Sequence, residues 1–162
     1  MKKISLLLTF AIFLIGNMVS AQTISEDDLP FTFLSWHYTN YPGSESNQWT
    51  RIEKDSEEYL FVDFIYEGKN LSVTYKPTGM RVKARTKYTD KDSPEQLSGF
   101  LTQRFEKYKI SSFMRIDLYD GAKVSDSFYS VKVKVKKEGY VFYFDEHFNR
   151  ITDPTARLLS SL

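Results

Sequence analysis

The chain has 162 residues, of which 41% are hydrophobic and 27% charged, and it can form one globular domain or two small ones. Aromatic residues make up 16% of the chain against only 7 glycines, which favours a β-rich core. A net charge of +1 argues against a nucleic-acid partner, and the absence of cysteine excludes disulfides, a thiolate nucleophile and a zinc ribbon.

Residues 1–21 are predicted to be a signal peptide. Lys2 and Lys3 precede an apolar run from Ile4 to Ile15, and Val19-Ser20-Ala21 matches the pattern that a signal peptidase reads. The apolar run is shorter than the roughly 20 residues that a transmembrane helix needs. Cleavage before Gln22 leaves a mature chain without a membrane span, and we expect that chain in the periplasm or in the medium.

The mature chain is predicted to contain two similar units in tandem. A leader at residues 22–30 precedes the first unit at residues 31–90, the second unit covers residues 91–153, and a tail at residues 154–162 follows. Each unit opens with apolar residues at helical spacing, namely Phe33, Leu34, Tyr38 and Tyr41 in the first unit and Phe100, Leu101, Phe105 and Tyr108 in the second. In the first helix His37 lies off this apolar stripe.

Each helix is followed by a short strand and a hairpin of two alternating runs with a glycine at the turn. The hairpin runs are residues 59–66 and 71–75 in the first unit, and residues 128–135 and 140–144 in the second. A further strand completes about four antiparallel strands in each unit. The expected fold class is therefore α+β, with the sheets of the tandem units forming one open surface and helices on one face. The alternative is a chance likeness between two unrelated α+β halves.

The alternation of side chains assigns the two faces of the sheet. In the second hairpin valines alternate with lysines, so the valines point to the core. The same register in the first unit leaves Phe61 and Ile65 outside, and the basic residues of the following strand are expected beside them. An exposed apolar patch marks a contact site. The predicted binding residues are Trp49, Arg51, Phe61, Ile65, Arg81, Lys83 and Arg85.

This aromatic and basic surface has two interpretations. As a binding surface it would anchor a protein partner through aromatic rings and select an acidic partner through arginine and lysine. As a structural surface it would only keep the sheet soluble and blunt its edges, with Trp49, Phe61 or Ile65 covered by the leader or by the other unit.

The order of motifs along the chain resembles a known family. Leu29-Pro30 opens a short helix that ends at Tyr41-Pro42-Gly43, then come Trp49 and a hairpin that ends in Tyr75-Lys76-Pro77-Thr78-Gly79. With Tyr140-Val141-Phe142-Tyr143-Phe144-Asp145 near the end, this order is similar to the PepSY-like family of β-lactamase-inhibitor-like proteins. The resemblance implies a secreted or periplasmic α+β protein with a broad, concave surface for another protein. It does not imply that a β-lactamase is inhibited.

The sequence lacks the signatures of an enzyme. Neither His37 nor His147 has a second His or Cys at metal-ligand spacing, and no Gly-x-Ser-x-Gly elbow is present. Asp145-Glu146-His147 fits a polar turn better than an acid-base cluster, and the acidic loop from Asp117 to Asp126 lacks the ligand order of an EF-hand. The chain is predicted to be non-enzymatic and to need no cofactor.

Two functions remain for the predicted surface. The first is an exported module that docks an envelope or extracellular protein on its open sheet. The alternative is a carrier for a small ligand or a glycan, with aromatic stacking in a cleft between the two units. An enclosed pocket of about 300 Å³ or more would favour the carrier.

Overall fold

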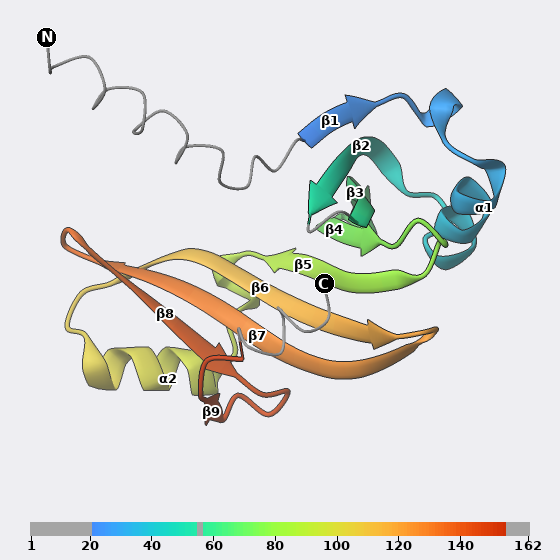
Figure 1. The fold of residues 1–162 in the computed structure, drawn as a ribbon. Helices are drawn as coiled ribbons and strands as arrows, with labels where there is room; N and C mark the ends of the chain where they lie inside the picture. Colours follow the sequence, from blue (N-terminus) through green and yellow to red (C-terminus); the bar gives the residue numbers. More distant parts are fainter. Residues whose placement is uncertain (1–20, 55–56, 155–162) are drawn as a thin grey trace, which may run out of the picture.

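Nine strands form one continuous antiparallel sheet in the computed structural model, which describes residues 21–54 and 57–154 (Figure 1). Neighbours in the chain are neighbours in the sheet. The strands are β1 (Ala21–Ile24), β2 (Glu45–Lys54), β3 (Glu57–Tyr66), β4 (Lys69–Tyr75), β5 (Arg81–Tyr88), β6 (Lys109–Asp120), β7 (Lys123–Val135), β8 (Glu138–Phe144) and β9 (Arg150–Ile151). Two ten-residue helices, α1 (Phe31–Asn40) and α2 (Glu95–Arg104), accompany them. The fold is therefore mainly β.

The expected α+β tandem repeat of a helix plus about four strands is wrong, because one nine-stranded sheet runs through the described residues and its class is mainly β. β5, which was expected to close the first unit, pairs with β6 over Lys83–Tyr88 and Phe113–Leu118. The backbone ladder thus passes without a break from residues 31–90 into residues 91–153. Unpaired strand edges leave rows of N–H and C=O groups without partners, and the pairing of β5 with β6 removes two such edges. The signal peptide and the tail lie outside the described residues, apart from Ala21 and Pro154.

α1 covers the first half of the sheet. Val62 on β3 stands opposite Trp49 on β2 and opposite Val73 on β4, and directly opposed residues share one face. All three side chains are buried in one cluster with Phe33 of α1. Burial of this apolar row fixes α1 against the sheet.

The stripe that α1 buries differs from the expected one. The buried residues are Phe33, His37 and Tyr41, four residues apart, whereas Tyr38 is exposed. A histidine fits this stripe because hydroxyl groups lie near both ring nitrogens: Nδ1 is 3.1 Å from the Tyr75 hydroxyl and Nε2 is 3.2 Å from the Ser44 hydroxyl. A buried imidazole with hydrogen-bond partners costs far less than one without them.

α2 covers the same face of the sheet farther along. Tyr88 follows Ala84 by four residues on β5, so both side chains point to the same side. Tyr88 stands opposite Phe113 of β6, which lies in the buried cluster of Leu97 and Leu101 from α2. Both helices therefore lie on one face, and no helix of the described residues covers the opposite face.

The two hairpins turn differently. Between β3 and β4 the turn consists of Glu67 and Gly68, both with positive φ, and glycine adopts that conformation without strain. The second hairpin turns between Val135 and Glu138, so Gly139 lies inside β8 and not in the expected turn. None of the described helices is long and apolar enough to cross a membrane.

Candidate binding site

The helix-free side of the sheet carries a mixed set of apolar, polar and basic side chains. Phe61 and Lys83 both stand opposite Thr74, so these three point to one side. Asp63 and Arg85 likewise stand opposite Ser72. We call this surface the open face, and it comprises Gln48, Phe61, Asp63, Ile65, Ser72, Thr74, Lys83, Arg85, Lys87 and Met114.

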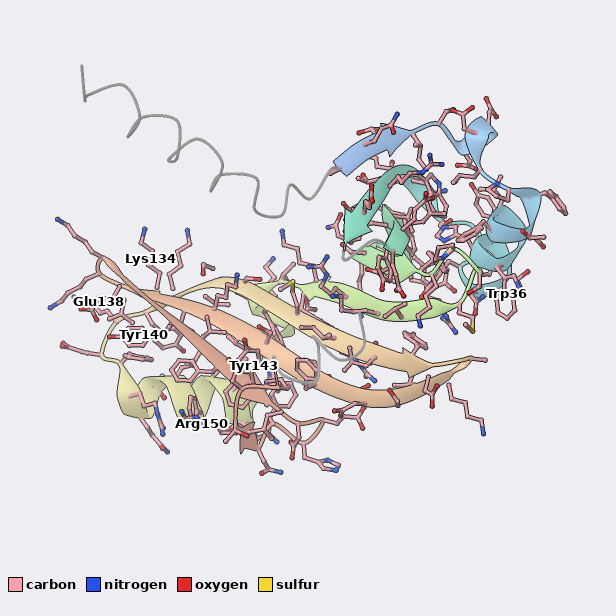
Figure 2. All side chains as sticks on the ribbon, in the orientation of Figure 1. Trp36, Lys134, Glu138, Tyr140, Tyr143 and Arg150 are labelled. Atoms are coloured by element: carbon pink, nitrogen blue, oxygen red, sulfur yellow. The ribbon has the colours of Figure 1, made fainter. Side chains whose placement is uncertain are left out.

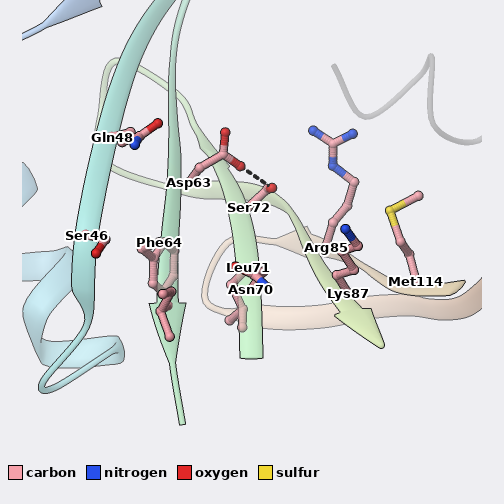
Figure 3. Close-up of a pocket in the computed structure, with 11 residues that line it drawn as sticks. Ser46, Gln48, Asp63, Phe64, Asn70, Leu71, Ser72, Arg85, Lys87 and Met114 are labelled. Carbon is pink, nitrogen blue, oxygen red and sulfur yellow. Dashed lines mark hydrogen bonds between the residues drawn. The ribbon is translucent and has the colours of Figure 1, made fainter. Parts of the chain in front are cut away.

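A hollow of about 450 Å³ lies on the open face (Figure 3). Five adjacent strands, β2 to β6, contribute to its lining because the strands follow one another in chain order. The lining residues are Ser46, Gln48, Asp63, Phe64, Ile65, Asn70, Leu71, Ser72, Arg85, Lys87 and Met114. Within the hollow, the Ser72 hydroxyl donates a 2.5 Å hydrogen bond to the Asp63 carboxylate, so this acidic group already has a protein partner.

Basic charge dominates the β5 side of the hollow. The guanidinium carbon of Arg85 lies 5.4 Å from the centroid of the Phe61 ring, within cation–π range. Lys87 is exposed two residues farther along the same strand. Ile65 and Met114 add apolar surface beside these charges. The hollow thus combines cationic donors with apolar contact area.

On the helix-free side, the part of the sheet formed by β6 and β7 is covered by other side chains and is not accessible. Ile116, Leu118 and Phe128 form a buried cluster there, and Tyr143 and Ile151 pack against it. The accessible part of the open face therefore lies over β2 to β5 and the adjoining rim of β6.

Trp49 and Arg51 do not lie on the open face, and the predicted exposure of Trp49 is wrong. Trp49 is only 2% exposed, and its ring centroid is 5.1 Å from that of His37. The pairing of β2 with β3 sets Arg51 opposite Leu60, so Arg51 also faces the helix side. There the Arg51 Nε lies 3.1 Å from Glu58 Oε1.

Arg81, the third predicted binding residue that does not lie on the open face, is turned away because the ladder between β4 and β5 shifts by one residue at Tyr75. Simple alternation would place Arg81 beside Lys83. Instead its guanidinium carbon lies 4.3 Å from the Tyr119 ring centroid, and its Nη1 donates to the Tyr41 hydroxyl over 3.3 Å. Burial, with Tyr41 nearby, raises the pKa of Tyr119 to about 12, so this ring stays neutral beside the cation.

Four of the seven predicted residues remain together on the open face: Phe61, Ile65, Lys83 and Arg85. Sequence reasoning missed Gln48 and Met114, which line the same hollow. Gln48 lies on β2 and Met114 on β6, and no local sequence pattern identifies the strands that pair with β2 and β6. Only the register of the assembled sheet shows that the two residues share the open face.

The polar turn after β8 has a structural role. The Asp145 carboxylate accepts the backbone N–H groups of His147 at 2.9 Å and Asn149 at 2.8 Å. The Asn149 side chain, which donates as well, holds the pKa of Asp145 below its ordinary value. Among residues 21–54 and 57–154, no group of three His, Asp or Glu side chains is placed to hold a metal ion.

Solved structures of Bacteroides proteins are similar to this fold. A BLIP-like protein from Bacteroides fragilis matches over 78% of this chain and 89% of its own, with 16% identity and a TM-score of 0.60. A DUF2874 family protein from Bacteroides uniformis matches over 76% and 87%, with 17% identity and a TM-score of 0.60. A third, from Bacteroides eggerthii and described as a "putative periplasmic" protein, matches over 76% and 86%, with 16% identity and a TM-score of 0.60.

These similarities show a shared BLIP-like fold. No family model and no curated protein matches the chain. The PepSY-like resemblance therefore stays a prediction.

Proposed function

We propose that the chain is a non-enzymatic, exported binding module that docks a protein partner on its open face. The observation that carries this proposal is the hollow of about 450 Å³ on the helix-free side, with Arg85 and Lys87 at its rim. The BLIP-like fold supports a binding role, and the description of the Bacteroides eggerthii neighbour supports the periplasm.

The rim chemistry favours an acidic partner. Arg85 lies over Phe61, so its guanidinium is held in place before a partner arrives. A carboxylate that meets Arg85 and Lys87 gains charge-assisted hydrogen bonds, which are stronger than neutral ones. Ile65 and Met114 provide apolar contact next to these charges. An acidic loop that also carries an apolar side chain matches this surface.

A small ligand or glycan is the second candidate, because the volume of the hollow lies in the range of ligand pockets. Sugar stacking needs an accessible ring, however. Phe64, which lines the hollow, is 3% exposed, and the half-buried Phe61 ring of the open face lies under the Arg85 guanidinium. The hollow also spreads over five strands on a side without helices. Both features favour docking of a protein.

The position of β1 fits the proposed export. Cleavage before Gln22 leaves Gln22, Thr23 and Ile24 of β1, which stand opposite Arg51, Thr50 and Trp49 of β2. The mature chain would therefore begin inside the sheet and keep most of this edge strand.

The test uses the mature chain and two charge-reversal variants. A partner captured from an envelope fraction would be purified, and its affinity measured by calorimetry for the wild type, for Arg85→Glu/Lys87→Glu and for Lys107→Glu/Lys123→Glu. The second pair is exposed and lies away from the open face, in the α2–β6 connection and at the β6–β7 hairpin.

We expect Arg85→Glu/Lys87→Glu to weaken binding at least tenfold, which is about 1.4 kcal/mol. The Lys107→Glu/Lys123→Glu control should bind like the wild type. Equal affinity of all three proteins would refute docking on the open face. Saturable binding of a glycan at the hollow, blocked by the Arg85 variant, would instead support the carrier.

A further inference from the structure

Charge is segregated between two parts of the molecule. Residues 22–50 contain Glu26, Asp27, Asp28 and Glu45 but no lysine or arginine. β5 shows the opposite balance, with four basic residues and no acidic one. Glu45 stands opposite Ile65 at the edge of the open face. The other three acidic residues precede α1, and the Glu26 carboxylate accepts a hydrogen bond from Tyr38 of that helix, whereas Lys83 and Arg85 lie on the open face.

The acidic region also carries exposed aromatic side chains. Phe31 is 81% exposed and Trp36 is 51% exposed, both on α1, and Asp27 and Asp28 lie just before the helix. We call these four residues the α1 patch: Phe31 at the start of the helix follows Asp28 by three residues, and Trp36 lies five residues farther along, on another side of the helix. Figure 2 shows Trp36 at the α1 end of the molecule, far from Tyr140 at the opposite end. Large aromatic rings on a surface favour contact with another surface.

The α1 patch cannot reach the open face of its own chain. α1 packs on the helix side of the sheet through Phe33, whose ring centroid is 6.1 Å from that of Tyr75. Arg85 and the hollow lie on the reverse side, so the sheet itself separates the two surfaces. Any contact between them must join two molecules.

We propose that the α1 patch of one copy docks on the open face of a second copy. Asp27 and Asp28 would face Arg85 and Lys87, while an aromatic ring of α1 enters the hollow. This inference rests on the proposed function, since it uses the same face and adds a second copy as an occupant. Complementary charge would steer and orient the contact.

The contact is heterologous, because each copy contributes a different surface. Such contacts build chains or rings instead of closed symmetric pairs. An acidic protein partner would compete with the α1 patch of the second copy for the open face, so partner binding would dissociate the assembly. Self-association would thereby keep the open face covered until a partner arrives.

Sedimentation velocity of the mature chain tests the proposal. We expect species larger than the monomer to grow with protein concentration at low ionic strength. High salt should shift the distribution toward the monomer, because exposed charge pairs are screened. A wild type that stays monomeric at all soluble concentrations would overturn the inference.

Two variants separate the donor from the acceptor surface. Phe31→Ser/Trp36→Ser removes the α1 patch rings, and Arg85→Glu/Lys87→Glu reverses the acceptor charge; circular dichroism checks that both fold. Each variant alone should be monomeric, and their equimolar mixture should form a 1:1 dimer, because one intact donor and one intact acceptor remain. Lys107→Glu/Lys123→Glu should assemble like the wild type.

Assembly of either variant alone, or a mixture that stays monomeric while the wild type assembles, would show that the contact lies elsewhere. The outcome is separable from the proposed function. A monomeric wild type whose partner binding depends on Arg85 overturns only the self-association. Self-association that Arg85→Glu/Lys87→Glu abolishes, with partner binding unaffected by that variant, overturns only the partner site.

Discussion

At the residue scale, the two tryptophans have opposite environments. Trp49 is 2% exposed, with its ring 6.2 Å from that of Tyr75, while Trp36 is 51% exposed on α1. Both are aromatic residues in the same acidic stretch of the chain. Their roles differ because Trp49 stands opposite Val62 in the sheet, on the side that α1 covers.

We expect Trp49→Ala to lower the free energy of unfolding by about 3–5 kcal/mol, because it removes a large buried side chain and leaves a cavity. Trp36→Ala is the matched control and should change stability by no more than about 0.5 kcal/mol. Urea unfolding of both variants measures this. If Trp49→Ala has nearly wild-type stability but loses partner binding, Trp49 is a surface binding residue and not part of the core.

His37 is a buried titratable group of the α1 core. It is fully buried, and the nearest ring, Phe64, has its centroid 4.7 Å away. Burial lowers the pKa of His37, and Asn47 and Glu26 offset part of this effect. The fold therefore favours the neutral imidazole.

Stability should depend on pH through His37. Its pKa in the unfolded chain is about 6.5 and its folded pKa is lower, so below pH 6.5 the unfolded state binds more protons. The stabilisation is complete above this value and is lost as the pH falls toward the folded pKa. Urea titrations between about pH 5.5 and 7.5 should show this slope.

Two variants test whether His37 causes this pH dependence of stability. His37→Gln should be less stable and should lose most of the pH dependence in this window, whereas His147→Asn, in the exposed turn, should keep it. An unchanged slope in His37→Gln would assign the pH dependence to other groups.

At the scale of the strand, the register shift at Tyr75 sends Arg81 to the helix side and leaves Arg85 on the open face. Both arginines lie on β5, four positions apart. Without the shift they would share one face. One irregularity in the ladder thus places two similar residues on opposite faces of the sheet.

Arg81→Ala should lower the free energy of unfolding by about 0.5–2 kcal/mol, the range of a cation–π contact from exposed to desolvated, without changing partner affinity. Arg85→Ala should mainly weaken the complex, with a loss of about 0.5 kcal/mol of stability from its more exposed cation–π contact with Phe61. Urea unfolding and calorimetric titration of both variants test this. Similar effects from both substitutions would contradict the shifted register.

At the scale of the whole molecule, the sheet connects two apolar cores. α1 covers one buried cluster and α2 another, and the β5–β6 ladder joins them through Lys83–Tyr88 and Phe113–Leu118. The exposed α1 patch and the basic open face lie on opposite sides of this sheet. The same layer therefore unites the cores and separates the two surfaces.

Because β5 and β6 are paired over Lys83–Tyr88 and Phe113–Leu118, the two cores should unfold together. Differential scanning calorimetry of the mature chain should show one transition, with equal calorimetric and van't Hoff enthalpies. Two separate transitions, or a van't Hoff enthalpy well below the calorimetric one, would mean that residues 31–90 and 91–153 behave as independent units.

Local patterns in the sequence indicated the existence of two helices, the alternating strands and the outward direction of Phe61 and Ile65. These properties depend on neighbours in the chain, since side chains alternate along a strand and recur every three to four residues in a helix. The basic residues Lys83 and Arg85 followed from the same alternation. Local patterns did not give the extent of the second helix, since α2 ends at Arg104, before the expected helical residues Phe105 and Tyr108.

Only the tertiary structure decided which strands pair and in which register. The pairing of β5 with β6 made the backbone ladder continuous, the β2–β3 register buried Trp49, and the shift at Tyr75 turned Arg81 to the helix side. The physical reason is that a change of one residue in register moves every side chain of a strand to the other face. Backbone hydrogen bonding and core packing over the whole sheet select the register, and no single strand contains that information.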